Sequence, residues 1–239
     1  PPPRSDHERA TRTPPLDPNR LPHSTLYGNN ELQKSVRATL RGRLESADGP
    51  ARLNGLNLHA ADVRRLRGVT ILACGTSWHA ALIGRYLIED LVGLPVRVEY
   101  ASEYRYQRQL DLEDRLVVAI SQSGETADTL EAMRAAKAAG GRVVGIVNVV
   151  GSTIAREATG GIYLHAGPEI GVASTKAFTS QITALVLLAL HLGRHRDMSA
   201  ETSARLIAEL ERIPELIERT LQLDEKVHRI AEIYANARN

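Results

Sequence analysis

The stretch VVAISQSGETADTLEAMRAA, which runs from Val117 to Ala136, decides the fold. It begins with β-branched and apolar residues that predict a buried strand, passes through small polar residues and a glycine, and continues in a helical pattern. A strand that ends in such a loop and leads directly into a helix is typical of a parallel α/β sheet. We therefore take this strand–loop–helix unit as the element around which the rest of the chain is arranged.

Further short apolar runs follow the same arrangement along the chain. Their near-continuous apolar character predicts strands that are buried on both faces, and the intervals between them are long enough for crossover helices. We therefore expect an α/β fold: a doubly wound five-stranded parallel sheet with helices on both faces, plus flanking helices. The predicted strands are VTILA from Val69, VRVEY from Val96, LVVAI from Leu116, RVVGIVNV from Arg142 and GIYL from Gly161.

Helical patterns flank the predicted sheet. Residues 29–43 place apolar side chains four apart and predict a helix, and residues 60–66 predict a shorter one. The stretch from Thr175 to Gly193 is apolar nearly all round, so we expect it in a core or a subunit interface, with Gly193 as its end. Beyond Asp197 the pattern is amphipathic, and Pro214 is expected to start a new helix.

These patterns predict four segments. Residues 1–22 contain seven of the 11 prolines and no apolar period, so we expect a flexible proline-rich leader. An N-terminal helical segment follows over residues 23–68, and the α/β domain extends over residues 69–197. Residues 198–239 form the C-terminal amphipathic helices.

Composition excludes several classes of function. The net charge is +2, and the 30 Lys and Arg residues are spread among 28 Asp and Glu, so we expect no nucleic-acid partner. No apolar stretch reaches the ~18 residues of a membrane span, so no membrane association is expected. The single cysteine, Cys74, offers neither a disulfide nor a thiolate metal cage, and we expect a cytoplasmic protein without a metal.

Three predicted strands end in loops rich in hydroxyls and glycine: residues 74–77, 121–126 and 151–153. Ligands bind at the carboxyl ends of parallel strands, where helix N-termini supply N–H donors and partial positive charge for a phosphate without any basic side chain. The alternative for a single loop is that Ser123 and Thr126 only cap the following helix. Two such loops in one sheet favour phosphate binding.

Other phosphate-binding motifs are missing from the sequence. There is no G-x-x-x-x-G-K-[ST], and no G-x-G-x-x-G follows the first strand, so neither a nucleoside triphosphate nor a dinucleotide is indicated. A small phosphorylated ligand remains, and no cofactor is expected.

Five motifs occur in the order CGTSWHAA, ASEYRY, SQSGETADTL, GSTIARE and AGPEIGVASTKAFTSQ. They resemble the first sugar-isomerase (SIS) domain of the glutamine:fructose-6-phosphate aminotransferase (isomerizing) family, from about Asn30 to Asn239. The resemblance implies the SIS fold and a substrate site that holds the phosphate at Ser77 and residues 121–126 and the sugar at Thr76 and residues 172–174. The implied substrate-binding residues are Thr76, Ser77, Ser121, Gln122, Ser123, Thr126, Val172, Ala173 and Ser174.

Departures from the family pattern limit what the resemblance implies. Cys74 does not match the family's glutaminase nucleophile, and the glutamate, lysine and histidine of its second SIS domain have no counterpart, so no catalytic residue is assigned. NNELQKS stands where the family has a motif like KEIxEQP. We expect residues 198–239 to correspond to a linker toward a second SIS domain missing from this chain, which is therefore catalytically incomplete.

The expected partners are fructose 6-phosphate or glucosamine 6-phosphate and a second copy of the chain. The resemblance implies paired SIS domains, and the apolar faces of Thr175 to Gly193 and of the C-terminal helices suit a homodimer. Two alternatives stay open: a standalone SIS module that senses a sugar phosphate, and a single-domain ketose-phosphate isomerase.

Four charged or titratable residues lie near the expected site. Glu125 is expected in the first turn of a helix, and Glu169 is expected to fix its loop by accepting backbone hydrogen bonds. Lys176 either neutralises the ligand or lies in the first turn of the long helix with an outward salt bridge. His79 is expected to be a surface or packing residue rather than a phosphate ligand.

Overall fold

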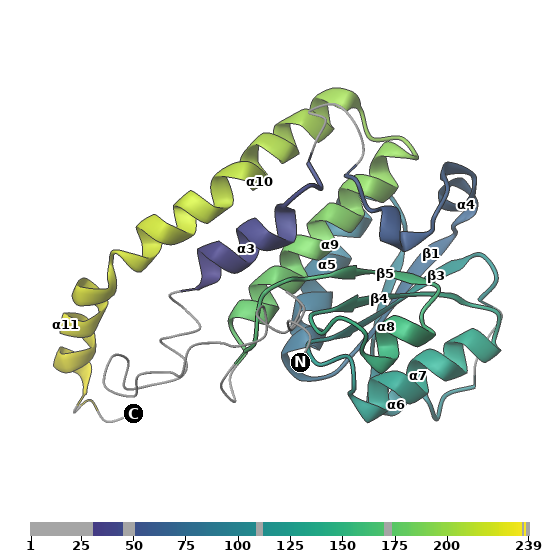
Figure 1. Ribbon diagram of the computed structural model, residues 1–239, viewed down its shortest axis with the longest axis horizontal. Coiled ribbons are helices and arrows are strands. Elements are labelled where there is room, and N and C mark those ends of the chain that lie inside the picture. The colour runs from purple at the N-terminus through teal and green to yellow at the C-terminus, as the bar shows by residue number, and fades with distance from the viewer. Residues whose placement is uncertain (1–30, 45–50, 109–111, 170–173, 236, 238–239) are drawn as a thin grey trace, which may run out of the picture.

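The computed structural model describes residues 31–44, 51–108, 112–169, 174–235 and 237. Its centre is a five-stranded, all-parallel sheet in the order β2-β1-β3-β4-β5 (Figure 1). The predicted doubly wound five-stranded parallel sheet is confirmed. The strands are β1 Gly68–Ala73, β2 Val96–Tyr100, β3 Arg115–Ser121, β4 Arg142–Val147 and β5 Gly160–Tyr163.

The strand order reverses between β1 and β3. From β1 the chain moves outward to β2, then returns to the other side of β1 and continues through β4 to β5. β1 and β3 pair directly, from Gly68 opposite Arg115 to Leu72 opposite Ala119, so their carboxyl ends lie side by side. Such a reversal is where open parallel sheets bind ligands.

Helices cover both faces of the sheet (Figure 1). One face carries α5 (Gly75–Val92) and α9 (Lys176–Arg194), which run side by side, with Gly84 of α5 against Leu185 of α9. The other face carries three shorter helices, and each face has its own hydrophobic core. The shorter helices are α6 Ala101–Tyr104, α7 Ala127–Ala138 and α8 Thr153–Glu157.

The region before the sheet joins the core of the α5 and α9 face. The helix predicted over residues 29–43 is α3 (Leu32–Leu40), which buries Val36 and Leu40 and lies beside α9 and α10 (Ala200–Leu221) in Figure 1. A 3-10 turn, η1, covers Asn54–Leu56, and the short predicted helix is α4 (Ala60–Arg65).

The long apolar helix is confirmed as a core helix. α9 is long and apolar enough to span a membrane by length and composition alone, but 78% of its most apolar window is buried within the chain. The prediction that it ends at Gly193 is wrong by one residue, since Arg194 is still helical. Gly193 instead makes room for Met198, whose side chain would meet a β-carbon there at 2.6 Å.

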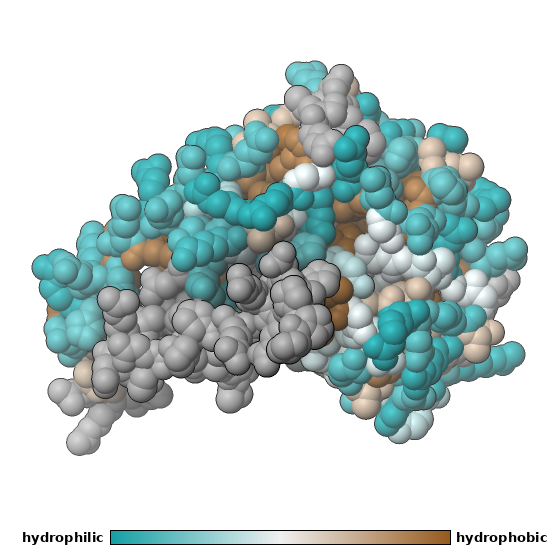
Figure 2. Space-filling view, in the orientation of Figure 1, coloured by the Kyte–Doolittle hydropathy of each residue, from teal (hydrophilic) through white to brown (hydrophobic). Residues whose placement is uncertain are grey.

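The prediction that Pro214 starts a new helix is also wrong. α10 runs through Pro214 without a break, and a separate helix, α11 (Asp224–Tyr234), follows (Figure 1). Pro214 lies on the same buried face as Ile207 and Leu210, and burial of that face holds the helix together where a backbone hydrogen bond is missing. The outward surface along α10 is mainly hydrophilic (Figure 2).

Candidate functional site

Two loops meet at the reversal of the strand order. The β1 loop, residues 74–77, follows β1 and includes the first turn of α5, and the β3 loop, residues 121–126, follows β3. The pairing of the two strands brings most of the predicted site residues to one edge of the sheet. Ser77 and Ser121 are buried there, Gln122, Ser123 and Thr126 are half-buried, and Thr76 is exposed.

Each loop leads into a helix whose first turn has no side-chain cap. Cys74 is the N-cap of α5 and Thr126 the N-cap of α7, and neither side chain bonds to its helix. Thr126 Oγ1 instead forms a hydrogen bond of 2.9 Å with Ser121 Oγ, and Ser123 Oγ accepts from the Glu125 N–H at 3.2 Å. The hydroxyls of the β3 loop therefore do not cap α7, and the free first-turn N–H groups of two helices face one edge.

The β3 loop closes on itself around a glycine. Ser121 Oγ accepts from the Gly124 N–H at 3.0 Å, and Gly124 has a φ of +67°. A β-carbon at Gly124 would lie 2.1 Å from Ser152 Oγ, closer than any non-bonded contact allows. Only glycine satisfies both the left-handed conformation and the close approach of Ser152.

The third hydroxyl-rich loop, after β4, braces the β3 loop from the side. Ile154 of α8 donates its N–H to the Gly124 carbonyl at 3.0 Å, and the Thr153 N–H donates to Glu125 Oε1 at 2.8 Å. The prediction that Glu125 lies in the first turn of its own helix is wrong, because α7 begins at Ala127. Glu125 caps α8 instead, and the Thr153 hydrogen bond lowers the pKa of its carboxyl, which is therefore ionised at neutral pH.

Ser77 has a partner that sequence reasoning did not identify. Gln181 of α9, 1% exposed, donates from Nε2 to Ser77 Oγ at 2.9 Å. The available signal was an amide side chain in a largely apolar helix, because a buried amide must find a hydrogen-bond partner. His79, two residues beyond Ser77, is exposed, the first of the two predicted alternatives, and its Nδ1 lies 3.0 Å from the Gly75 carbonyl oxygen.

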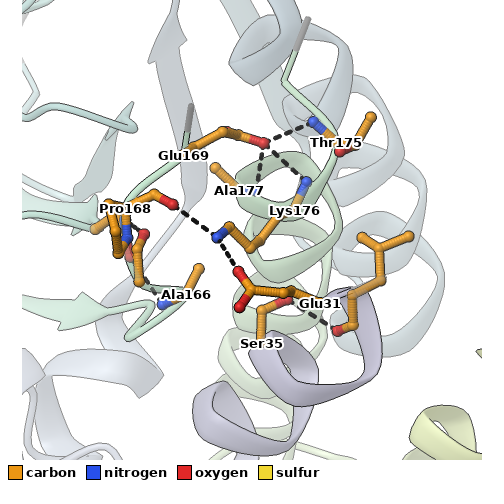
Figure 3. A network of polar contacts seen from close by, with 11 residues as sticks. Glu31, Ser35, Ala166, Pro168, Glu169, Thr175, Lys176 and Ala177 are labelled. Atoms are coloured by element: carbon orange, nitrogen blue, oxygen red, sulfur yellow. Dashed lines mark hydrogen bonds and ion pairs between the residues drawn. The ribbon is translucent and has the colours of Figure 1, made fainter. Parts of the chain in front are cut away.

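Glu169 organises the start of α9 (Figure 3). Its Oε1 accepts from the backbone N–H groups of Thr175 at 2.8 Å and Lys176 at 2.9 Å, and its Oε2 accepts from Ser174 Oγ at 2.9 Å. The prediction that Glu169 fixes its loop is confirmed. Of the predicted sugar-lining residues, Ser174 is half-buried beside this cap, whereas Val172 and Ala173 lie outside the described residues.

Lys176 lies in the first turn of α9 but points inward. Its side chain is 1% exposed, and Nζ donates to Glu31 Oε2 at 2.8 Å and to the Pro168 carbonyl at 2.7 Å (Figure 3). The outward salt bridge is therefore wrong, because the ammonium group is paired within the chain. The other alternative, neutralisation of the ligand, would compete with this pair.

Comparisons with known proteins agree with the α/β fold of this chain. The sequence matches the SIS domain family over residues 64–191, more than half of the chain. It is 51% identical over 215 residues to glutamine–fructose-6-phosphate aminotransferase (isomerizing) of Symbiobacterium thermophilum, an alignment that covers 89% of this chain and 35% of that protein. It is 45% identical over 205 residues to glutamine–fructose-6-phosphate aminotransferase (isomerizing) 2 of Mus musculus, which covers 85% of this chain and 30% of the mouse protein.

Among solved structures, the C-terminal domain of glucosamine-fructose-6-phosphate aminotransferase from Francisella tularensis superposes with a TM-score of 0.83 at 34% identity, covering 92% of this chain and 62% of that one. This chain spans about a third of the length of the curated relatives it matches. The chain therefore belongs to the SIS domain family, and it is homologous to part of the glutamine–fructose-6-phosphate aminotransferases.

Proposed function

We propose that this chain binds a hexose 6-phosphate, either fructose 6-phosphate or glucosamine 6-phosphate. In this proposal it is the sugar-phosphate-binding part of an enzyme that converts fructose 6-phosphate and glutamine into glucosamine 6-phosphate and glutamate. The observation that carries the proposal is the pair of uncapped helix N-termini, α5 and α7, at adjacent strand ends lined with hydroxyls. The identity of the proposed ligand follows from the names of the relatives.

The phosphate would lie between the β1 loop and the β3 loop. Ser77 accepts from Gln181 and so keeps its own proton to donate to a phosphate oxygen. Ser121, Ser123 and Thr126 would add hydroxyls, and the first-turn N–H groups of α5 and α7 would add donors with partial positive charge. This arrangement holds an anion without lysine or arginine.

The sugar would extend from the phosphate toward the start of α9. Thr76 and Ser174 are the described residues proposed for this part of the site, and Val172 and Ala173 complete the set from outside the described residues. Gln122 is proposed with the phosphate-binding residues of the β3 loop. The two carboxylates near the site, Glu125 and Glu169, are both engaged as helix caps. We therefore propose that the chain alone binds without turnover.

A thermal-shift titration with fructose 6-phosphate tests this function. Ligand at about 100 times its dissociation constant raises the free energy of unfolding by about 2.7 kcal/mol, which is a readily measured rise in Tm. The Ser121→Ala/Ser123→Ala variant should lose this rise. Ser199→Ala is the matched control, because Ser199 caps α10 with a hydrogen bond to the Thr202 N–H, so its loss should lower stability and leave the ligand-induced rise unchanged.

Two results would contradict the proposal. A parent chain whose Tm stays constant up to millimolar fructose 6-phosphate does not bind the ligand, and a rise that survives Ser121→Ala/Ser123→Ala places the site elsewhere. Formation of glucosamine 6-phosphate by the chain alone, with ammonia as the nitrogen donor, would contradict the absence of turnover.

We also propose that the chain forms a homodimer through α11. α11 buries none of its residues, yet Val227, Ile230 and Ile233 recur at helical spacing and are 59%, 48% and 77% exposed. A second copy of the chain would cover this apolar face. Sedimentation velocity should give a dimer for the parent chain and a monomer for Ile230→Glu.

A further inference from the structure

We propose that the ion pair between the buried Lys176 and the half-buried Glu31 positions Ser174 and thereby sets the affinity for the sugar part of the ligand, separately from the phosphate part. The inference rests on the proposed function and goes beyond it. It assigns a role to two residues outside the phosphate-binding loops: Glu31, which sequence reasoning did not place near the site, and Lys176, for which it offered a different role.

The ion pair joins three segments that are distant in sequence. Lys176 Nζ bonds Glu31 Oε2, 145 residues earlier and directly before α3, and the carbonyl of Pro168, in the loop after β5 (Figure 3). Lys176 is 1% exposed. A buried ammonium group must be paired, so the first turn of α9 is held at a fixed place relative to α3 and the β5 loop.

The groups that bind Lys176 are connected to Ser174 by a short chain of contacts. Pro168 precedes Glu169, whose carboxylate accepts from the N–H groups of Thr175 and Lys176 and from Ser174 Oγ. Lys176 thus holds this short network at both ends, through its side chain at Pro168 and through its backbone at Glu169. If the ammonium group loses its partners, Glu169 and Ser174 are no longer held in a fixed position.

The direction of these hydrogen bonds gives Ser174 a defined chemical role. Its hydroxyl proton points to Glu169 Oε2, so the lone pairs of Oγ remain to accept from a donor such as a sugar hydroxyl. Ser77 has the opposite polarity, since it accepts from Gln181 and donates outward. One end of the site therefore accepts from hydroxyls and the other donates to phosphate.

The packing of α9 against α5 brings the start of α9 close to the phosphate-binding end of α5. Gln181 lies beside Ser77, and Leu185 lies beside Gly84, so the two helices run parallel. Lys176 precedes Gln181 by five residues, or about 7.5 Å of helix, whereas α5 begins only two residues before Ser77, so α9 extends beyond the start of α5. Ser174 precedes Lys176 by two residues, so it lies close to this end of α9.

The decisive experiment compares two ligands on the full 239-residue chain. Isothermal titration calorimetry gives the Kd for fructose 6-phosphate and the Kd for inorganic phosphate, in the parent and in the Glu31→Gln/Lys176→Met variant. This variant removes both charges together, so that neither charge is left buried without a partner. We expect roughly a tenfold loss of affinity for fructose 6-phosphate, the size of one lost hydrogen bond, and less than about a twofold change for inorganic phosphate.

A double-mutant cycle separates positioning from general stability. Ser174→Ala should weaken fructose 6-phosphate binding in the parent and cause no further loss in Glu31→Gln/Lys176→Met, since the three residues act as one unit. Circular dichroism verifies folding of each variant. Glu31→Asp keeps the charge and shortens the side chain, so it is a milder test. It should also lower the affinity for fructose 6-phosphate relative to the affinity for inorganic phosphate.

The inference is overturned if both ligands weaken by the same factor, or if Ser174→Ala and the ion-pair change have additive effects. Failure of the proposed function has a different signature, because the parent chain itself would then bind neither fructose 6-phosphate nor inorganic phosphate.

Discussion

Gln181 of α9 donates its amide N–H to Ser77 Oγ of α5 at 2.9 Å, and both side chains are buried. The two residues are 104 positions apart in the chain. This hydrogen bond ties the helix that begins at the β1 loop to the core helix of the same face, and it fixes the direction in which the Ser77 hydroxyl can donate. Replacement of Gln181 is therefore an indirect test of the phosphate site.

Gln181→Met should weaken phosphate binding with little loss of stability. The change removes the donor to Ser77, and it also removes Oε1, a buried oxygen without a hydrogen-bond partner. Removal of an unsatisfied acceptor offsets the loss of one hydrogen bond, so we expect the free energy of unfolding to change by less than about 1 kcal/mol. The Kd for inorganic phosphate, measured by calorimetry, should rise roughly tenfold.

Thr183→Val is the matched control for that experiment. Thr183 lies on the same helix, and its hydroxyl bonds the Thr179 carbonyl within α9 rather than any part of the site. Its Kd for phosphate should equal that of the parent. An unchanged Kd in Gln181→Met would show that Ser77 needs no partner to hold its orientation.

Gly124→Ala should disrupt the β3 loop. The left-handed backbone costs an alanine about 1 to 2 kcal/mol, and the clash with Ser152 adds a cost typical of overpacking, about 1 to 3 kcal/mol. Chemical denaturation should show the summed loss, and binding of fructose 6-phosphate should weaken because Ser121 and Thr126 move.

Two further variants separate the causes. Gly140→Ala has the same backbone conflict, with φ at +82°, but open space around it at the far end of α7, so it should lose stability without losing ligand affinity. Gly124→Ala/Ser152→Gly removes the clash and keeps the backbone conflict. If that double variant is no more stable than Gly124→Ala, the close approach of Ser152 does not explain the need for glycine.

His191 should make the protein less stable as the pH falls below neutrality. Burial lowers its pKa from the usual value of about 6.5, so the unfolded chain binds a proton more readily than the folded one below that pH. The stability contributed by the neutral ring is present above pH ~6.5 and is lost as the pH falls toward the lower folded pKa.

Urea denaturation at pH 7.5, 6.5 and 5.5 measures this dependence. His191→Asn should show a shallower decline, by at most about 1.4 kcal/mol per pH unit for one proton. The pKa of His195 is also lowered by burial, and its ring lies 4.8 Å from that of His191, so His195→Asn is measured in parallel to separate the two. Equal slopes for parent and His191→Asn would show that another group controls this range.

Pro214→Ala should raise the free energy of unfolding. A proline within a helix costs about 3 kcal/mol relative to alanine, since it removes a backbone hydrogen bond, and α10 is continuous through this position. Loss of the buried ring offsets part of the gain, which leaves an expected rise of about 1 to 2 kcal/mol by chemical denaturation. Glu211→Ala, an exposed change on the same helix, should have no more than about 0.5 kcal/mol of effect, and a less stable Pro214→Ala would show that ring packing dominates.

Much of the fold could be predicted because its signals are local. β-branched runs, amphipathic periods and glycine-containing loops each depend on a few neighbouring residues, and the five strands occur where these patterns place them. Local rules failed where packing decided the outcome. Pro214 continues a helix because its face is buried, and Glu125 caps a neighbouring helix because α8 lies beside the β3 loop.

The sequence by itself determined the order of strands and helices, the hydroxyl-rich loops at the strand ends and the resemblance to the SIS domain. Only the tertiary structure decided that β1 and β3 pair, so that two of those loops are neighbours, and that Lys176 turns inward to Glu31 and Gln181 to Ser77. The physical reason is the range of the interaction. Propensity and periodicity act within a few residues, whereas the partner of a buried polar group is selected by the packing of segments more than 100 residues apart.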